Sequence, residues 1–235
     1  MIKRPKIRKS RTNTVISLVR EEVELDQYIQ DALSRGYANL SALARQIKPR
    51  IETKTGQKIT NSSVVTALKR IRTQRSNTER AVETLIANSV ITVRTNVAKL
   101  SLERTKHTLK IVAQIISAHH EEFIQLSETY SSITLVFDQK ILEKIKQEIP
   151  SHSVLEEGSD YAAIIIHSPQ EFIYTPGALL PFYAQLSRRG INIDNTVSCY
   201  TDTVIVVNMK DAGRAFEALT ELITHTKNKL TVGQT

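Results

Sequence analysis

The sequence predicts an α+β fold, in which a small helical domain precedes two units of strand, helix, two strands, helix and strand (βαββαβ). Three observations predict this fold. Apolar residues recur at helical spacing up to residue 87, and the periodicity changes after Asn88, where "SVITVRTNVAKLSLE" alternates as in strands. The strand and helix order then occurs twice, about 70 residues apart. Net positive charge is confined to the first third. Residues 1 to 80 hold 18 Lys and Arg against 7 Asp and Glu, whereas the remainder holds 14 against 17.

This uneven charge indicates a nucleic-acid partner for the basic part, and the alternative is a solvated basic tail on a neutral protein. No apolar run approaches the ~20 residues that span a bilayer, so we expect no membrane contact. The apolar stretch Val15 to Val19 is too short for the core of a signal peptide. A single cysteine, Cys199, excludes an intramolecular disulfide and a multi-cysteine metal site. We therefore expect a cytoplasmic protein.

The first element is a basic arm over residues 1–13. It carries six basic side chains, no acidic ones and little apolar surface, so we expect it to be disordered. Such an arm attracts phosphate groups without reading base sequence.

A helical domain over residues 14–75 follows, with three predicted helices. The first has an apolar face and ends at Gly36; that face comprises Leu25, Tyr28, Ile29, Ala32 and Leu33. The second begins at Asn39 or Ser41 and is weakened or ended at Pro49, before a polar loop "ETKTGQK". Its inward residues are Leu40, Leu43, Ala44 and Ile47. The third is capped by Asn61 and turns four residues inward: Val64, Val65, Leu68 and Ile71.

The outward face of the third helix is polar at its start and basic further along. Three short helices of this kind resemble a helix-turn-helix DNA-binding domain, in which the last helix enters the major groove. The resemblance implies contact with double-stranded DNA through Asn61, Ser62, Ser63, Thr66, Lys69, Arg70, Arg72 and Arg75. The loop before this helix is longer than the usual ~3–4 residues. The alternative is a solvated basic face on a small helical bundle.

A linker helix is predicted over residues 76–87, because Ser76 and Glu79 form a capping-box pattern before an apolar stripe. The first βαββαβ unit occupies residues 88–157 and closes with the strand "SVLEE". The second occupies residues 158–235, opens with the strand "DYAAIIIHS" and closes with a strand at 229–232. This is the ferredoxin-like pattern, in which right-handed crossovers place both helices of a unit on one sheet face.

The stretches "TPGALLPFYAQLSRRGINI" (175–193) and "TDTVIVVNMKDAGRAFEAL" (201–219) resemble the ACT domain, particularly the ACT pair at the regulatory end of aspartokinases. The resemblance implies that chains pair into a homodimer or a higher homo-oligomer. The first unit has no Pro-Gly before its helix and no Gly-Ile-Asn after it, so we expect it to be structural or dimer-forming. Pro181 requires the helix of the second unit to begin late or to bend.

ACT domains commonly bind amino acids in this corner, which implies a ligand site at Thr175, Pro176, Gly177, Ala178, Asn192, Ile193 and Asp194. A helix N-terminus favours a carboxylate. Asn192 and Asp194 would receive the ammonium group of the same ligand. The alternative is that Pro-Gly only forms a turn and that Gly190 only ends a helix.

No catalytic constellation is evident. The seven glycines are scattered and form no phosphate loop, and the neighbouring His119 and His120 do not share a helix face. We expect no enzymatic activity, no metal and no cofactor beyond an amino-acid effector. The predicted function is a DNA-binding transcriptional regulator that dimerises through ACT-like units and responds to a small ligand. The alternative is a regulatory or interaction subunit of a metabolic enzyme that does not bind DNA.

Overall fold

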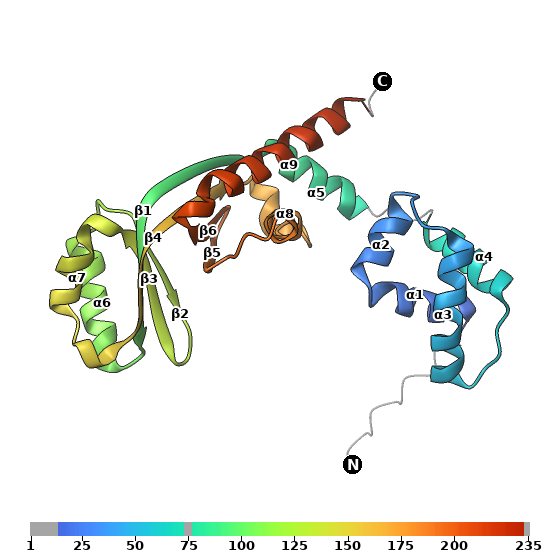
Figure 1. Ribbon diagram of the computed structural model, residues 1–235, viewed down its shortest axis with the longest axis horizontal. Helices are drawn as coiled ribbons and strands as arrows, with labels where there is room; N and C mark the ends of the chain where they lie inside the picture. Colours follow the sequence, from blue (N-terminus) through green and yellow to red (C-terminus); the bar gives the residue numbers. More distant parts are fainter. Residues whose placement is uncertain (1–13, 73–76, 233–235) are drawn as a thin grey trace, which may run out of the picture. The chain divides into compact units, whose positions relative to one another are not determined.

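The computed structural model describes residues 14–72 and 77–232, and the chain divides into two compact units, Met1–Asn77 and Thr78–Thr235 (Figure 1). The predicted basic arm (1–13) and Arg75 lie outside the described residues. The predicted α+β class, with a helical unit before ferredoxin-like units, is confirmed.

The N-terminal unit contains α1 (Val15–Glu24), α2 (Gln27–Ser34), α3 (Leu40–Thr55) and α4 (Asn61–Arg72). Each helix contributes apolar side chains to one shared core. The largest contributions are Leu18, Val19, Val23, Leu33, Ala44, Ile47, Ile51, Val64 and Leu68. Burial of these side chains, rather than helix propensity, stabilises helices of this length.

Two predictions for this unit are wrong. The first predicted helix is α2 and does not include Leu25, because Asp26 accepts hydrogen bonds from the backbone of Tyr28 and Ile29 and starts the helix there. The helix before it, α1, was not predicted. Leu25 therefore lies in the joint between α1 and α2 with 78% of its surface exposed, and Tyr28 on the first turn of α2 is 80% exposed. Neither side chain belongs to the core.

The second predicted helix does not end at Pro49. Helix α3 continues to Thr55 and ends at Gly56, whose φ of 68° is the left-handed conformation that suits glycine. Pro49 lies on the exposed side, where the carbonyl that loses its hydrogen bond can bind water. Ile47 and Ile51 are both buried on the opposite side, and their packing holds the helix together across the proline.

The C-terminal unit is one six-stranded antiparallel sheet in the order β2-β3-β1-β4-β6-β5. Short 3-10 turns connect several of its elements. The helices and strands are α5 (Asn77–Asn88), β1 (Val90–Glu103), α6 (Lys106–Ala118), β2 (Ile124–Glu128), β3 (Ser132–Asp138), α7 (Leu142–Glu148), β4 (Val154–His167), α8 (Leu180–Arg188), β5 (Asn195–Cys199), β6 (Asp202–Asn208) and α9 (Ala212–Val232).

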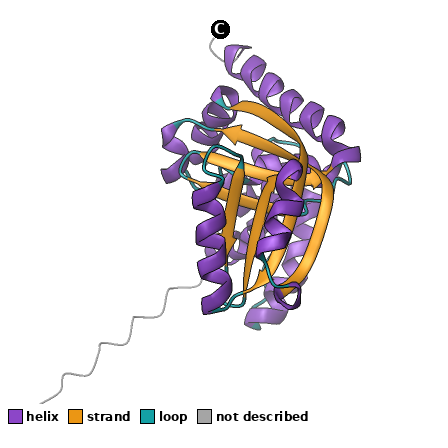
Figure 2. Ribbon diagram, turned by 90° about the vertical axis from the view of Figure 1, so that its left-hand side faces the viewer, coloured by secondary structure: helices purple, strands orange, loops and turns teal. Residues whose placement is uncertain are grey.

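The long strands β1 and β4 each pass through two βαββαβ halves. The first half contains residues 97–103 of β1, β2, β3 and residues 154–158 of β4. The second half contains residues 161–167 of β4, β5, β6 and residues 90–94 of β1. Strand order is the same in both halves, so the predicted repeat is real. The sheet curves strongly between them (Figure 2).

This shared sheet corrects the predicted closing strand. Residues 229–232 are the last turn of α9, and the strand that completes the second half is the beginning of β1. The predicted strands "SVLEE" and "DYAAIIIHS" are likewise one strand, β4. Along the chain, the first half is therefore inserted between two paired strand segments of the second half, residues 90–94 of β1 and 161–167 of β4.

Both helices of each half lie on one sheet face, as predicted. In the first half, Val112 and Ile115 of α6 and Ile145 of α7 pack on the alternate β1 residues Leu100 and Leu102. In the second half, α8 and α9 pack on the equivalent face of β4 and β6. Helix α5 adds Ile86 to that second core, so it packs against the sheet along its last turns.

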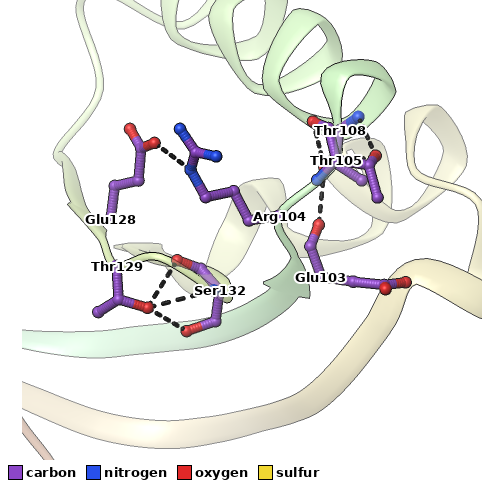
Figure 3. A network of polar contacts seen from close by, with 7 residues as sticks. All are labelled: Glu103, Arg104, Thr105, Thr108, Glu128, Thr129 and Ser132. Atoms are coloured by element: carbon purple, nitrogen blue, oxygen red, sulfur yellow. Dashed lines mark hydrogen bonds and ion pairs between the residues drawn. The ribbon is translucent and has the colours of Figure 1, made fainter.

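Short side-chain hydrogen bonds fix the entry into α6 and the β2–β3 turn (Figure 3). Thr105 accepts a hydrogen bond from the backbone N–H of Thr108 at 3.1 Å, and Thr108 accepts one from the N–H of Thr105 at 2.8 Å. This reciprocal pair is a capping box. Thr129 accepts from the N–H of Ser132 at 3.1 Å and closes the turn between β2 and β3. Helix α6 thus starts directly after β1.

Candidate functional site

The outward face of α4 is the first candidate site. Val64, Ala67 and Leu68 are buried, which leaves one exposed stripe along the opposite side of the helix. Four of the predicted DNA-contacting residues form this stripe: Ser62, Thr66, Lys69 and Arg70. Their spacing of three and four residues places them on adjacent turns of one helix face.

The remaining predicted residues of this set lie differently. Thr60, not Asn61, is the N-terminal cap of α4, because its hydroxyl accepts a hydrogen bond from the N–H of Ser63 at 3.2 Å. Ser63 is half-buried, and its hydroxyl donates to the carbonyl of Thr60 at 2.7 Å. Asn61 is exposed at the first position of the helix. Arg72 ends α4, and its side chain lies outside the described part of the chain.

Charge in the N-terminal unit is divided between its two pairs of helices. Residues 15–34 hold one basic and five acidic side chains, whereas residues 40–72 hold eight basic and one acidic. Helices α3 and α4 therefore carry nearly all of the positive charge of the described unit. The predicted DNA contacts lie only within residues 61–75 and include none of the basic residues of α3.

Three further basic residues belong to this surface: Arg45 and Arg50 on α3, and Lys58 in the loop before α4, are all exposed. Among the described residues we find no ion pair for any of the three. By contrast, Lys54 lies 3.1 Å from Glu21, and Lys48 lies 3.7 Å from Glu52. A cation without an acidic neighbour keeps its full charge for an anionic partner.

The second candidate site is the predicted ligand corner. Thr175 to Leu179 form a turn before α8 rather than its first helical turn. Two of the N–H groups here are already used: Thr175 donates to Phe172 at 3.4 Å and Ala178 to Thr175 at 3.4 Å. The N–H of Leu180, the first residue of α8, donates to Gly177 at 3.2 Å. Pro176 has no N–H. The predicted row of free N–H donors is therefore mostly absent from these residues.

Turn geometry accounts for the Pro-Gly pair. Gly177 has a φ of +81°, which L residues rarely adopt, and a Cβ added there would meet nothing within 4 Å. Ala178 is buried against Leu85 and Phe172. This corner is held by packing and by turn hydrogen bonds. Helix α8 begins at Leu180, so the prediction of a late start at Pro181 is confirmed.

The other three predicted ligand residues lie at the opposite end of α8. Nine helical residues separate the two groups, which corresponds to roughly 13 Å along the axis. Asn192 is exposed, Ile193 packs on the second core, and Asp194 directly precedes β5. Within one chain the structure does not bring the two parts of the predicted site together.

Asp194 faces Lys99 of the first half. The two charged atoms, Lys99 Nζ and Asp194 Oδ2, are 2.7 Å apart, and Nζ also lies 2.9 Å from Glu156 Oε1. Lys99 is buried, and its Nζ lies 5.7 Å from the centre of the Tyr161 ring. The carboxylate predicted to receive a ligand's ammonium group thus already receives the ammonium group of a lysine.

The electrostatics of this cluster follow from burial and pairing. Burial by itself lowers the pKa of Lys99, but the neighbouring carboxylates of Asp194 and Glu156 outweigh it, so the pKa lies above its usual value. Burial, and then the negative charge of Asp194, raise the pKa of Tyr161. Lys99 is therefore a permanently charged group in a partly dehydrated position.

A second ion pair lies close by. Arg94 donates two hydrogen bonds to Asp138, from Nε at 2.6 Å and from Nη2 at 2.8 Å, and its guanidinium stacks 5.1 Å from the centre of the Phe123 ring. The hydrogen bonds from Arg94 hold the pKa of Asp138 below its usual value. Neither ion pair was predicted, since each joins residues that are far apart in the sequence.

In residues 14–72 and 77–232, no three His, Cys, Asp or Glu side chains are grouped as a metal site would require. Nor does any helix of that part combine the length and hydropathy needed to cross a bilayer. His167 is hydrogen-bonded through both ring nitrogens, with Nδ1 at 3.0 Å from Asp202 and Nε2 at 3.2 Å from Thr92. Both of its ring nitrogens therefore have hydrogen-bond partners within the sheet.

The sequence matches no protein-family model, and no curated protein matches it. The C-terminal part of the structure is similar to aspartate kinase from Clostridium acetobutylicum, with 17% identity and a TM-score of 0.47 over 57% of this chain and 34% of that enzyme. It is similar to the regulatory subunit of aspartate kinase from Thermus thermophilus (12%, TM-score 0.47, 56% of this chain and 95% of that one). A putative C-terminal regulatory domain of aspartate kinase from Porphyromonas gingivalis W83 is also similar (12%, TM-score 0.46, 58% and 98%). The matched part spans about a third of the C. acetobutylicum enzyme.

Proposed function

We propose that this chain is a DNA-binding regulator whose C-terminal unit pairs two copies of the chain and responds to an amino acid. The observation that carries the DNA-binding part is the exposed stripe of α4, which is polar at its N-terminal end and basic further along. It belongs to α3, α4 and the loop between them, which together hold eight basic residues and one acidic one.

The arrangement of the stripe suits a major groove. The groove admits one α-helix, and residues near the start of such a helix contact base edges. Ser62 and Thr66 occupy those positions, and their hydroxyls both donate and accept hydrogen bonds. Lys69 and Arg70 follow further along the same helix, where their charged side chains would contact phosphate groups. Arg45, Arg50 and Lys58 extend the phosphate contacts beyond α4.

The sensing part is supported by the sequence motif of residues 175–193 and by the ferredoxin-like halves that carry it. In an ACT-type regulator, a dimer presents two DNA-binding units to two half-sites. A ligand then changes DNA affinity only when it binds one arrangement of the dimer more tightly than another. Asp194 is the proposed acceptor of the ligand's ammonium group.

The test of DNA binding is fluorescence anisotropy with labelled duplex DNA of mixed sequence at low salt. The variant Lys69→Gln/Arg70→Gln removes two charges from the stripe, and we expect its affinity to fall by about tenfold or more. The matched control is Lys110→Gln/Lys210→Gln, which removes two exposed charges from the C-terminal unit. Equal affinity of the two double variants would show that α4 is not the binding face.

A second candidate is a regulatory or interaction subunit that binds a metabolic enzyme instead of DNA. Large apolar side chains exposed on the N-terminal unit favour it, since such groups mark protein contacts when they are clustered. They are Leu25, Tyr28 and Tyr37, with 78%, 80% and 80% of their surface exposed. Failure of the wild-type chain to bind duplex DNA at low salt would select this candidate.

A further inference from the structure

The two halves of the C-terminal sheet meet at a local irregularity of β1 and β4. The pairing of these strands changes register between Arg94 and Val97 and again between Val97 and Lys99. At the same level Asn96 and Asp160 have φ values of 55° and 58°, which few residues other than glycine adopt. Backbone pairing is therefore weakest where the sheet bends, and side chains must contribute to fixing the bend.

Two ion pairs connect the halves across this bend. Lys99 of the first half meets Asp194 of the second, and Arg94 of the second half meets Asp138 of the first. An apolar cluster from both halves lies on the same level: Val97, Val136, Ala163, Val204 and Val206. The open faces of the two halves thus hold one another through one apolar cluster and two ion pairs.

The two ion pairs differ in whether a ligand could replace one of the partners. Arg94 and Asp138 form a bidentate pair, and neither residue belongs to the proposed ligand corner. The ammonium group of Lys99 contacts two carboxylates, that of Asp194 at 2.7 Å and that of Glu156 at 2.9 Å. If Asp194 took another cation, Lys99 would keep Glu156 as its partner and would not become a buried unpaired charge.

We infer that the Lys99–Asp194 ion pair is a latch between the two halves, and that an amino acid whose ammonium group binds Asp194 opens the latch by displacing Lys99. This inference rests on the proposed sensing function, because Asp194 is the proposed ammonium acceptor. The contact of Asp194 with the Lys99 ammonium group would be replaced by a contact with the ammonium group of the ligand. What changes is the restraint between the halves, which is the difference between two states that a ligand needs in order to shift an equilibrium.

The latch is tested by the distance between two spin labels, one on each half. Labels are attached at Lys144→Cys on α7 and Glu217→Cys on α9, both exposed, in a chain whose only cysteine is replaced by Cys199→Ser. Lys99→Met should broaden or shift the distance distribution. Lys146→Met is the matched control, since the ion pairs of Lys146 within residues 14–72 and 77–232 are with Glu143 and Glu157, both in the first half. An unchanged distribution in Lys99→Met would overturn the latch.

A variant that removes both charges covers the case in which Lys99→Met does not fold. Lys99→Met/Asp194→Asn leaves no unpaired carboxylate at position 194, and its label distances should also differ from those of wild type. If this double variant folds and keeps the wild-type distribution, the latch is overturned as well.

Opening by a ligand is tested with the twenty common amino acids as probes. A thermal-shift screen identifies any that bind, and a concentration of ~100 Kd should stabilise the chain by ~2.7 kcal/mol. For an amino acid that binds, Lys99→Met should lower the apparent Kd by about tenfold. This is the effect expected if about a tenth of the wild-type molecules, but all molecules of the variant, are open before the ligand binds. Asp194→Asn should abolish binding.

The outcomes separate the two proposals. If no amino acid shifts the melting temperature, amino-acid sensing fails, while the label distances in Lys99→Met still decide whether the latch exists. If an amino acid binds but leaves the wild-type label distances unchanged, sensing stands and opening by displacement is overturned.

Discussion

The two halves of the C-terminal sheet share strand order and helix placement, but their first helices begin in different ways. In the first half, α6 starts two residues after β1, and a reciprocal capping box between Thr105 and Thr108 closes its first turn. In the second half, twelve residues separate β4 from α8, and α8 has no side-chain cap. Gly177 in that connection is exposed and left-handed. One scaffold therefore supports a helix entry closed by a side-chain capping box and another held by turn hydrogen bonds and packing.

The comparison separates stability from recognition. In the first half, the capping box gives partners to two backbone N–H groups at the start of α6. The second half contributes the longer connection and also Asp194, which pairs with Lys99 of the first half. A duplicated fold can thus keep one copy as the partner that restrains the other.

The largest effect on this comparison is expected from Lys99→Met. Removing the ammonium group leaves Asp194 without its partner in a half-buried position, and we expect a loss of about 3 kcal/mol in the free energy of unfolding. Chemical denaturation followed by circular dichroism measures it. Lys146→Met, which breaks ion pairs within the first half only, should cost at most about 1 kcal/mol. Equal losses in the two variants would contradict a special role for Lys99.

Two smaller effects should distinguish the helix entries. Thr105→Ala removes a cap and should cost about 1–2 kcal/mol of stability without affecting amino-acid binding. Gly177→Ala should cost about 1 kcal/mol, because alanine resists the positive φ although space is available. If residues 175–178 form part of a ligand site between chains, only Gly177→Ala also weakens binding. Thermal shifts with and without an amino acid report both quantities.

The ion pair on the other side of the bend predicts a pH dependence. Hydrogen bonds from Arg94 lower the pKa of Asp138 below its usual 3.8. The stabilisation is therefore complete above about pH 5 and is lost as the pH falls through the lowered pKa. Asp138→Asn should flatten the fall in unfolding free energy between about pH 5 and pH 2. Glu143→Gln, which removes an exposed carboxylate from the same half, should keep the pH dependence of the unfolding free energy seen in wild type. A similar flattening in Glu143→Gln would argue against Asp138 as the source.

Periodicity predicted the architecture of both units, but it did not give the correct ends of every helix and strand. Residues 154–167 form one strand because Gly158 continues β4, where its missing side chain leaves room for the Tyr161 ring. A glycine after two acidic residues suggests a break in the sequence alone. Helix α1 was missed because Val15 to Val19 was judged only as a candidate signal segment, whereas Leu18, Val19 and Val23 together form an apolar helix face.

The candidate sites were predictable to different degrees. The stripe of α4 follows from the spacing of Ser62, Thr66 and Lys69, which local helix geometry fixes. The pairing of Lys99 with Asp194 does not follow from spacing, since it depends on how the two halves bend toward each other. The separation of Gly177 from Asn192 was missed for the same reason: both flank α8 in the sequence but lie at its two ends.

The central claim, that helices α3 and α4 bind duplex DNA through phosphate contacts, is tested most directly by the salt dependence of the binding constant. A plot of log K against log salt concentration should fall by ~0.9 for each phosphate neutralised. We predict a steep slope for the wild-type chain and a slope shallower by about two for Lys69→Gln/Arg70→Gln. Absence of binding at low salt, or the same slope in both proteins, would contradict the account.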